Sequence, residues 1–119
     1  MHIEAFREYC IAKTGVTEEL PFDEDTLVFK VGGKMFALCS LSEYERGIAL
    51  KCLPEKAEEL RELYPDRVFP GYHMSKKHWN TVLPEAGLQE QLIKDWIDDS
   101  YFLVASKLTK AVKASLGLL

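Results

Sequence analysis

A glycine pair between two strand-like runs is the feature that most constrains how this chain can fold. Residues 26–31 and 34–39 are short and rich in β-branched, aromatic and aliphatic side chains, and only Gly32-Gly33 separates them. Glycine supplies the positive φ angles that a two-residue hairpin turn needs. A second turn at residues 42–47 leads into a third apolar run at residues 48–52. The sequence therefore predicts a meander of three antiparallel strands.

Helical periodicity flanks this meander on both sides. Ile3, Phe6 and Cys10 recur at helical spacing, and Pro54 suits the first turn of a second helix. Residues 88–108 predict the longest helix, because their apolar side chains share one broad face. Helices and antiparallel strands in this order predict an α+β fold, a single twisted antiparallel sheet with helices packed against it.

The remaining segments are shorter. The acidic run at residues 18–25 predicts a solvated connection, and residues 67–72 and 79–83 predict short extended pieces. A helical wheel of the last long helix puts Asp98 on its solvent side. The wheel also puts Phe102 on the polar side, which predicts either a bend in the helix or a covering element.

Length and composition indicate one domain, residues 1–119, of an ordinary globular protein. Hydrophobic residues make up 47% of the 119 residues, and no apolar run approaches the ~20 residues that span a bilayer. Three cysteines, an odd number, favour reduced thiols and a cytoplasmic location. A net charge of −4 disfavours a protein that coats nucleic acid, although it allows a local basic surface.

Residues 72–82 form such a local surface, with two histidines, two lysines, two large aromatic side chains and no acid. Lysine side chains hold phosphates, and imidazole and amide groups donate hydrogen bonds. Tyr72 and Trp79 add aromatic rings that stack on bases. The pattern therefore predicts a nucleic-acid contact, possible partners being DNA or, alternatively, a protein. The predicted contact residues are His73, Lys76, Lys77, His78 and Asn80.

A structural explanation of the same residues is equally open. Trp79 alternates with Thr81, as a core anchor of a strand does, and His78 and Asn80 can cap a turn. The lysines can form a plain solvated surface. The tail residues Lys107, Lys110 and Lys113 join the basic surface only if the tertiary fold brings them there.

Other chemistries find little support. His73 and His78 are five positions apart, which does not match a helical zinc pair, and no two cysteines have metal-ligand spacing. Ser75 precedes His78 without a nucleophile elbow, and Cys52 fits a buried thiol. We therefore expect no metal, no cofactor and no enzymatic activity.

The segment Tyr72–Val82 resembles the signature of the MmcQ/YjbR family of small bacterial proteins, and the run Lys76–Val82 is its specific part. Residues 50–55, 70–73 and 98–104 resemble other parts of that family, so the resemblance spans nearly the whole chain. Ser75 stands where the family often has asparagine. The resemblance implies a CyaY-like or secretion-chaperone-like fold and a double-wing arrangement for DNA binding, without an established activity.

Three functional hypotheses follow. The first is a small cytoplasmic protein that binds DNA through the basic-aromatic surface. The second is a protein-interaction or adaptor module that neither binds nucleic acid nor catalyses a reaction. The third is a small-molecule or enzyme site, which requires a concave pocket lined by Tyr72, His73 and His78.

Overall fold

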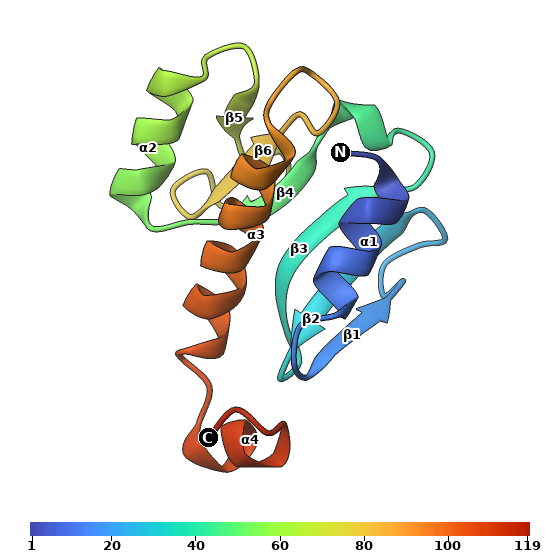
Figure 1. The fold of residues 1–119 in the computed structure, drawn as a ribbon, viewed down its shortest axis with the longest axis vertical. Coiled ribbons are helices and arrows are strands. Elements are labelled where there is room, and N and C mark those ends of the chain that lie inside the picture. The colour runs from blue at the N-terminus through green and yellow to red at the C-terminus, as the bar shows by residue number, and fades with distance from the viewer.

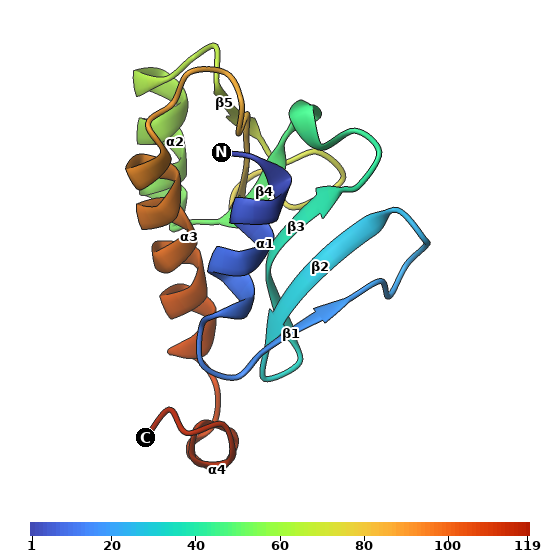
Figure 2. The same ribbon diagram turned by 45° about the vertical axis from the view of Figure 1, so that its right-hand side comes forward.

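Six strands form one antiparallel sheet, and helices cover one of its faces, in the computed structural model of residues 1–119 (Figures 1 and 2). The strand order is β1-β2-β3-β4-β6-β5, and every neighbouring pair is antiparallel. The strands are β1 (Val16–Glu19), β2 (Thr26–Val31), β3 (Lys34–Ser40), β4 (Ile48–Lys51), β5 (Val68–Pro70) and β6 (Trp79–Val82). The helices are α1 (Ile3–Ile11), the 3-10 turn η1 (Tyr44–Arg46), α2 (Pro54–Leu63), α3 (Glu90–Ala105) and α4 (Lys110–Ser115).

The predicted meander is confirmed as β2, β3 and β4. Both glycines of the β2–β3 turn have positive φ, 59° at Gly32 and 78° at Gly33. The pairing of β2 with β3 shifts after Phe29, and this bulge turns two consecutive residues, Phe36 and Ala37, into the core. The bulge thus adds Phe36 to the inward side chains opposite α3. Phe36 packs edge-on against Tyr101, with ring centroids 5.4 Å apart.

The two faces of the sheet differ because side chains alternate along each strand. The inward row packs under α1 and α3 in the main core. The outward row lies on the face without helices (Figure 2) and stays largely apolar across five paired strands. The outward row is Val28, Leu38, Ala49, Thr81 and Phe69.

A fully buried serine ties the longest helix to the sheet. The Ser100 hydroxyl on α3 donates to the carbonyl of Phe36 at 2.5 Å and accepts from the backbone N–H of Lys51 at 2.9 Å. Both partners lie at strand positions where the ladder leaves a backbone group free. One hydroxyl therefore completes the hydrogen bonding of β3 and β4 under the helix.

The structure corrects part of the prediction for the acidic run at residues 18–25. Glu18 and Glu19 belong to an edge strand, β1, which pairs with β2, whereas residues 20–25 form a largely exposed connection as predicted. Glu18 pairs with Arg7 of α1, and Glu19 pairs with Lys30 of β2 at 3.3 Å. Cross-strand and strand-to-helix ion pairs of this kind allow acidic residues on a short edge strand.

Two details of the last long helix also differ from prediction. Asp98 does not simply face solvent, because it accepts a hydrogen bond from the Tyr9 hydroxyl at 2.8 Å and forms an ion pair with Lys13. Phe102 is 63% exposed, and α3 runs unbroken through it, so neither a bend nor a cover accounts for this aromatic. The helix ends at Ala105, three residues before the predicted end at Leu108.

A hydrogen-bonded turn organises the loop before β2. Asp25 accepts from the Ser40 hydroxyl at 2.5 Å and from the backbone N–H of Ser42 at 2.8 Å. These hydrogen bonds, led by the one from the Ser40 hydroxyl, lower the pKa of Asp25.

The helices of this chain are all too short or too polar to cross a lipid bilayer.

Candidate nucleic-acid interface

The basic-aromatic segment is the loop between β5 and β6, residues 71–78. Its two ends pair through the N–H of Gly71, which donates to the Trp79 carbonyl at 2.8 Å. Gly71 is required there, because a Cβ would lie 2.8 Å from the Cβ of Trp79 and 3.0 Å from its carbonyl oxygen. Inside the loop, the Ser75 carbonyl accepts from the backbone N–H groups of His78 and Trp79. The loop is therefore a structured turn held at the end of a hairpin.

A guanidinium group anchors this loop from the helical layer. Arg61 of α2 donates to the Asn80 side-chain oxygen at 2.7 Å, to the Trp79 carbonyl at 3.2 Å and to the Lys76 carbonyl. The planar guanidinium suits several acceptors at once. Arg61 therefore joins α2, β6 and the loop, and it leaves the Lys76 side chain free to point to solvent.

Four of the five predicted contact residues are on the surface. His73, Lys76, Lys77 and His78 are all exposed. Neither lysine pairs with a carboxylate, so their charges are available to an external anion. His73 is the one non-glycine residue with a positive φ, at 59°.

Asn80, the fifth predicted contact residue, is not on the surface. Its side chain is 2% exposed and faces α2, where its oxygen accepts from Arg61 and its amide donates to the Ala57 carbonyl at 3.3 Å. Alternation along β6 explains this placement, because Asn80 lies opposite Leu50 on the inward face while its neighbours Trp79 and Thr81 point outward. Asn80 therefore serves the fold and is removed from the candidate contact set.

Three lysines that are far apart in the sequence meet beside this loop. Lys34 opens β3, Lys51 ends β4 and Lys107 follows α3, and together they line a cavity of about 410 Å³. We call this the lysine cavity. No acidic residue lines it, and none of the three lysines forms an ion pair. Its apolar lining residues are Met35, Met74, Trp79, Val104 and Leu108.

A close contact at the first hairpin turn brings Lys107 to the cavity. A Cβ on Gly32 would lie 2.7 Å from the methyl carbons of Leu108, so the absence of a side chain lets Leu108 pack onto the turn. Lys107 thereby lies near the start of β3, close to Lys34. In the sequence, Lys51 alternates with inward apolar residues, which indicates that its side chain points outward. The sequence does not indicate that Lys34 and Lys107 lie beside it.

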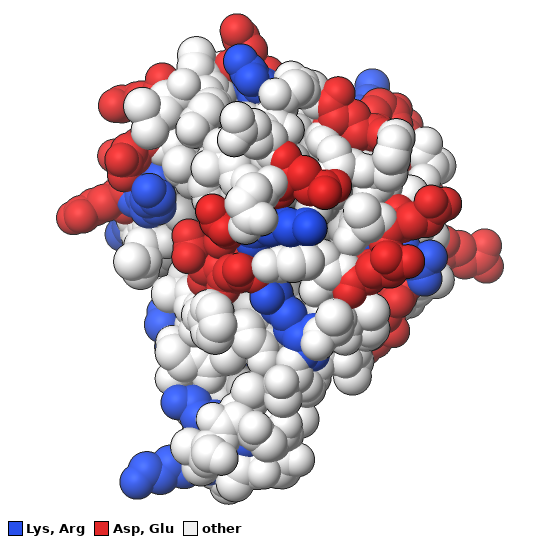
Figure 3. Space-filling model, in the orientation of Figure 1, with Lys and Arg blue, Asp and Glu red and all other residues white.

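The C-terminal end of the molecule is basic. Helix α4 begins at Lys110, with the Thr109 hydroxyl accepting from the N–H of Val112 at 3.2 Å. Lys113 donates to the Ser106 carbonyl at 3.0 Å, and no acid follows Asp99 in the sequence. The lower end of the molecule in Figure 3 accordingly shows blue side chains without red ones. Of the tail lysines, Lys107 lines the lysine cavity.

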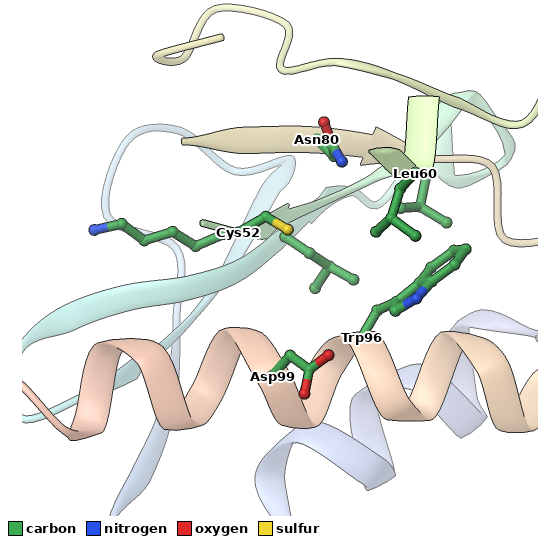
Figure 4. A pocket seen from close by; sticks show the side chains of 8 residues that line it. Cys52, Leu60, Asn80, Trp96 and Asp99 are labelled. Atoms are coloured by element: carbon green, nitrogen blue, oxygen red, sulfur yellow. The ribbon is translucent and has the colours of Figure 1, made fainter. Parts of the chain in front are cut away.

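Figure 4 shows a small cavity beneath Asn80, between α3 and the strands, into which Cys52 and Asp99 point. Its volume is about 20 Å³, which admits one water molecule and no substrate. Burial raises the pKa of the Cys52 thiol and also raises the pKa of Asp99. A neutral thiol is a weak nucleophile, so this pair lacks the activation that covalent catalysis requires.

The other two cysteines, Cys10 and Cys39, lie in the core. Burial is the main cause that raises the pKa of Cys39, to about 12, and it also raises that of Cys10. No group of three or more histidine, cysteine, aspartate or glutamate side chains is placed to hold a metal ion. Tyr72 and His73 do line a concave groove on the helix-free face, but His78 does not.

The fold and the site define a small α+β protein with a basic loop and a lysine cavity at one end of the central strands of an antiparallel sheet. The chain belongs to the YjbR family, whose model matches residues 11–103. The predicted family is thereby confirmed. The chain is 43% identical over 90 residues to uncharacterized protein YbdF of Escherichia coli O157:H7, covering 76% of this chain and 73% of that protein. It is 35% identical over 101 residues to uncharacterized protein YjbR of Escherichia coli K12, covering 85% of each.

Solved structures confirm the predicted fold class. Deinococcus radiodurans protein DR2400 superposes with a TM-score of 0.91 at 38% identity, covering 98% of this chain and 88% of that one. A protein from Pseudomonas syringae superposes with a TM-score of 0.70 at 29% identity, covering 87% of this chain and 99% of that one. The α+β architecture of an open antiparallel sheet with helices on it is therefore shared across these proteins.

Proposed function

We propose that this protein binds DNA through its phosphate backbone, using the loop lysines Lys76 and Lys77 together with the lysine cavity. The observation that carries the proposal is the convergence of Lys34, Lys51 and Lys107 from three separate elements around a cavity that no acid lines. Lysine side chains from three elements around one cavity can supply several cationic groups to a single bound phosphate. The proposal is of binding without catalysis.

The charge distribution explains how an acidic protein can do this. Six of the fifteen lysine and arginine side chains form ion pairs with carboxylates: Arg7, Lys13, Lys30, Arg46, Lys56 and Lys94. The five lysines of the proposed interface are not among them. The acids thus neutralise basic residues elsewhere and leave these five free for an external anion.

The number of phosphate contacts sets the expected salt dependence. Each phosphate contact to duplex DNA contributes about 0.9 to the slope of log affinity against log salt concentration. One phosphate at each loop lysine and one in the lysine cavity give a slope of about −2.7, so the affinity should fall about 40-fold between roughly 50 mM and 200 mM salt. Fluorescence anisotropy of a labelled duplex over this salt range measures the slope.

Charge-neutralising variants assign the contacts. Replacing Lys76 and Lys77 with glutamine should make the slope shallower by about 2. The matched control is the pair Lys56→Gln and Lys94→Gln, which removes the same charge from α2 and α3 and should leave the slope unchanged apart from a small general effect. Absence of DNA binding at low salt, or equal slopes for the two double variants, would contradict the proposal.

We also propose that the protein works in the cytoplasm and that its thiols take no part in binding. Cys10, Cys39 and Cys52 are all free, as expected in a reducing compartment. Cell fractionation tests the location. Alkylation of Cys52, the least buried of the three, should leave DNA affinity unchanged, and a loss of affinity would place this thiol in the interface.

A further inference from the structure

A second groove, of about 490 Å³, lies on the helix-free face of the sheet. Its floor includes Leu38, Ala49 and Thr81 from the outward row. Two strongly exposed aromatic side chains line it from different loops, Phe22 at 65% and Tyr72 at 77% exposure. Single exposed aromatics are common, but two of them around one apolar floor are typical of a binding groove.

The groove continues into the lysine cavity, because Met35 and Met74 line both. On β4, Ala49 lies in the groove and Lys51 lies in the cavity, two residues apart on the same face. A rise of about 3.4 Å per residue separates these two positions by about 7 Å. This distance is comparable to that between the phosphate and the base of one nucleotide. An anion at the lysines can therefore carry a planar group that lies over the groove.

The far end of the groove has no net positive charge. Glu43 and Arg46 both line it and pair with each other at 3.0 Å, and the loop that carries Phe22 also carries Asp23 and Glu24. No unpaired lysine or arginine at this end is therefore available to a second phosphate. The charge pattern thus favours a ligand with its negative charge at one end only, over a strand whose phosphates run along the whole groove.

We propose that the groove and the lysine cavity together bind one nucleotide unit. Lys34, Lys51 and Lys107 hold its phosphate, and its base lies against Tyr72 in the groove. The unit is either a free nucleotide or the terminal nucleotide of a DNA strand, because both present a phosphate and a planar base. This inference rests on the proposed function, since it names the part of the DNA that the same lysines hold.

Tyr72, the side chain proposed to stack on the base, contacts a second ring of the same loop. The rings of Tyr72 and His73 lie 4.1 Å apart between centroids. His73 is the one non-glycine residue with a left-handed backbone conformation, so the ring contact lies where the loop has its positive φ angle.

Binding of three nucleic-acid probes tests the inference. A short single strand with a terminal phosphate should bind more tightly than the same strand without the phosphate, and more tightly than a blunt duplex. Adenosine monophosphate should compete with the phosphorylated strand. Anisotropy measures the strands, and displacement of the labelled strand measures the mononucleotide.

Aromatic variants locate the base. Tyr72→Ala should weaken binding of the phosphorylated single strand about 5- to 150-fold, the range that base–aromatic stacking gives. Tyr72→Phe should retain the affinity, because it keeps the ring. The matched control is Phe102→Ala, which removes another strongly exposed aromatic side chain, from α3, and should change nothing.

The outcomes separate this inference from the proposed function. Equal binding of duplex and single strand, with Tyr72→Ala having no effect, overturns the nucleotide groove and leaves backbone binding intact. Binding of adenosine monophosphate that Tyr72→Ala weakens, without any DNA binding, supports the groove and overturns the DNA proposal. Binding of neither probe overturns both.

Discussion

Arg61 holds the β5–β6 loop, residues 71–78, to the helical layer, and its removal should destabilise the whole protein. The Arg61 guanidinium donates to the Asn80 side-chain oxygen at 2.7 Å, to the Trp79 carbonyl at 3.2 Å and to the Lys76 carbonyl. Asn80 is only 2% exposed, so the loss of Arg61 leaves a buried acceptor without its partner. The perturbation is therefore Arg61→Ala.

The expected loss of unfolding free energy is about 2–3 kcal/mol. A hydrogen bond from a charged donor is worth about 1.5–3 kcal/mol, and an unsatisfied buried acceptor costs a similar amount. We count only the bond to Asn80 in full, because the Lys76 carbonyl lies on the exposed side and water can replace the donor there. For a chain of this length, 1 kcal/mol lowers the melting temperature by about 3–6 °C.

Urea unfolding and thermal unfolding measure this loss. Arg46→Ala is the matched control, since Arg46 is highly exposed and forms only an i,i+3 pair, which is worth at most about 1 kcal/mol. A double-mutant cycle with Asn80→Ala isolates the pair and should give a coupling energy of about 1–2 kcal/mol. A loss below about 0.5 kcal/mol for Arg61→Ala, or negligible coupling with Asn80, would refute the reasoning.

The same variant should also loosen the loop. Trypsin cuts after lysine, and the anchored loop presents two of them, Lys76 and Lys77. Without Arg61, local opening becomes less costly, so cleavage at these two lysines should accelerate more than global unfolding alone accounts for. Cleavage rates that follow only the change in global stability would show that the loop does not depend on this anchor.

Three further predictions concern single positions. Ser100→Ala should cost about 1–3 kcal/mol in urea unfolding, because it leaves the backbone N–H of Lys51 without its acceptor; a change near zero would contradict this account. Gly71→Ala should cost about 1–3 kcal/mol by thermal unfolding, since its Cβ would press against Trp79, and an unchanged melting temperature would show that the loop yields freely. Folding lowers the pKa of Asp25, so its contribution is present above the unfolded pKa of about 3.9 and is lost as pH falls through the lower folded pKa. The melting temperatures of wild type and Asp25→Asn should therefore converge below about pH 4, and a constant gap would contradict this.

The strands and helices that sequence reasoning found are those with strong local signals. The β2–β3 hairpin needed only its glycine pair, and α3 needed only its apolar face, because both patterns lie within a few consecutive turns or strands. The missed element, β1, has four residues with two acids, and its stability comes from pairing with β2 and from ion pairs to other elements. No local pattern contains that information.

The candidate site divides in the same way. Composition located the loop. The loop lies between two strands, and this position explains why His73, Lys76, Lys77 and His78 are exposed. The inward placement of Asn80 depended on the register of β6 against β4, and sequence reasoning put this residue in the wrong set.

The sequence by itself determined the family, the fold class and the basic loop, because each can be inferred from patterns of residues that are close together in the chain. Only the tertiary structure decided that Lys34, Lys51 and Lys107 share one cavity and that an aromatic groove continues from it. The physical reason is that side chains from distant segments meet only after the strands pair and Leu108 packs onto the hairpin turn. The positive charge is thus contributed by neighbouring residues of the sequence at the loop, and it is assembled by tertiary packing in the lysine cavity.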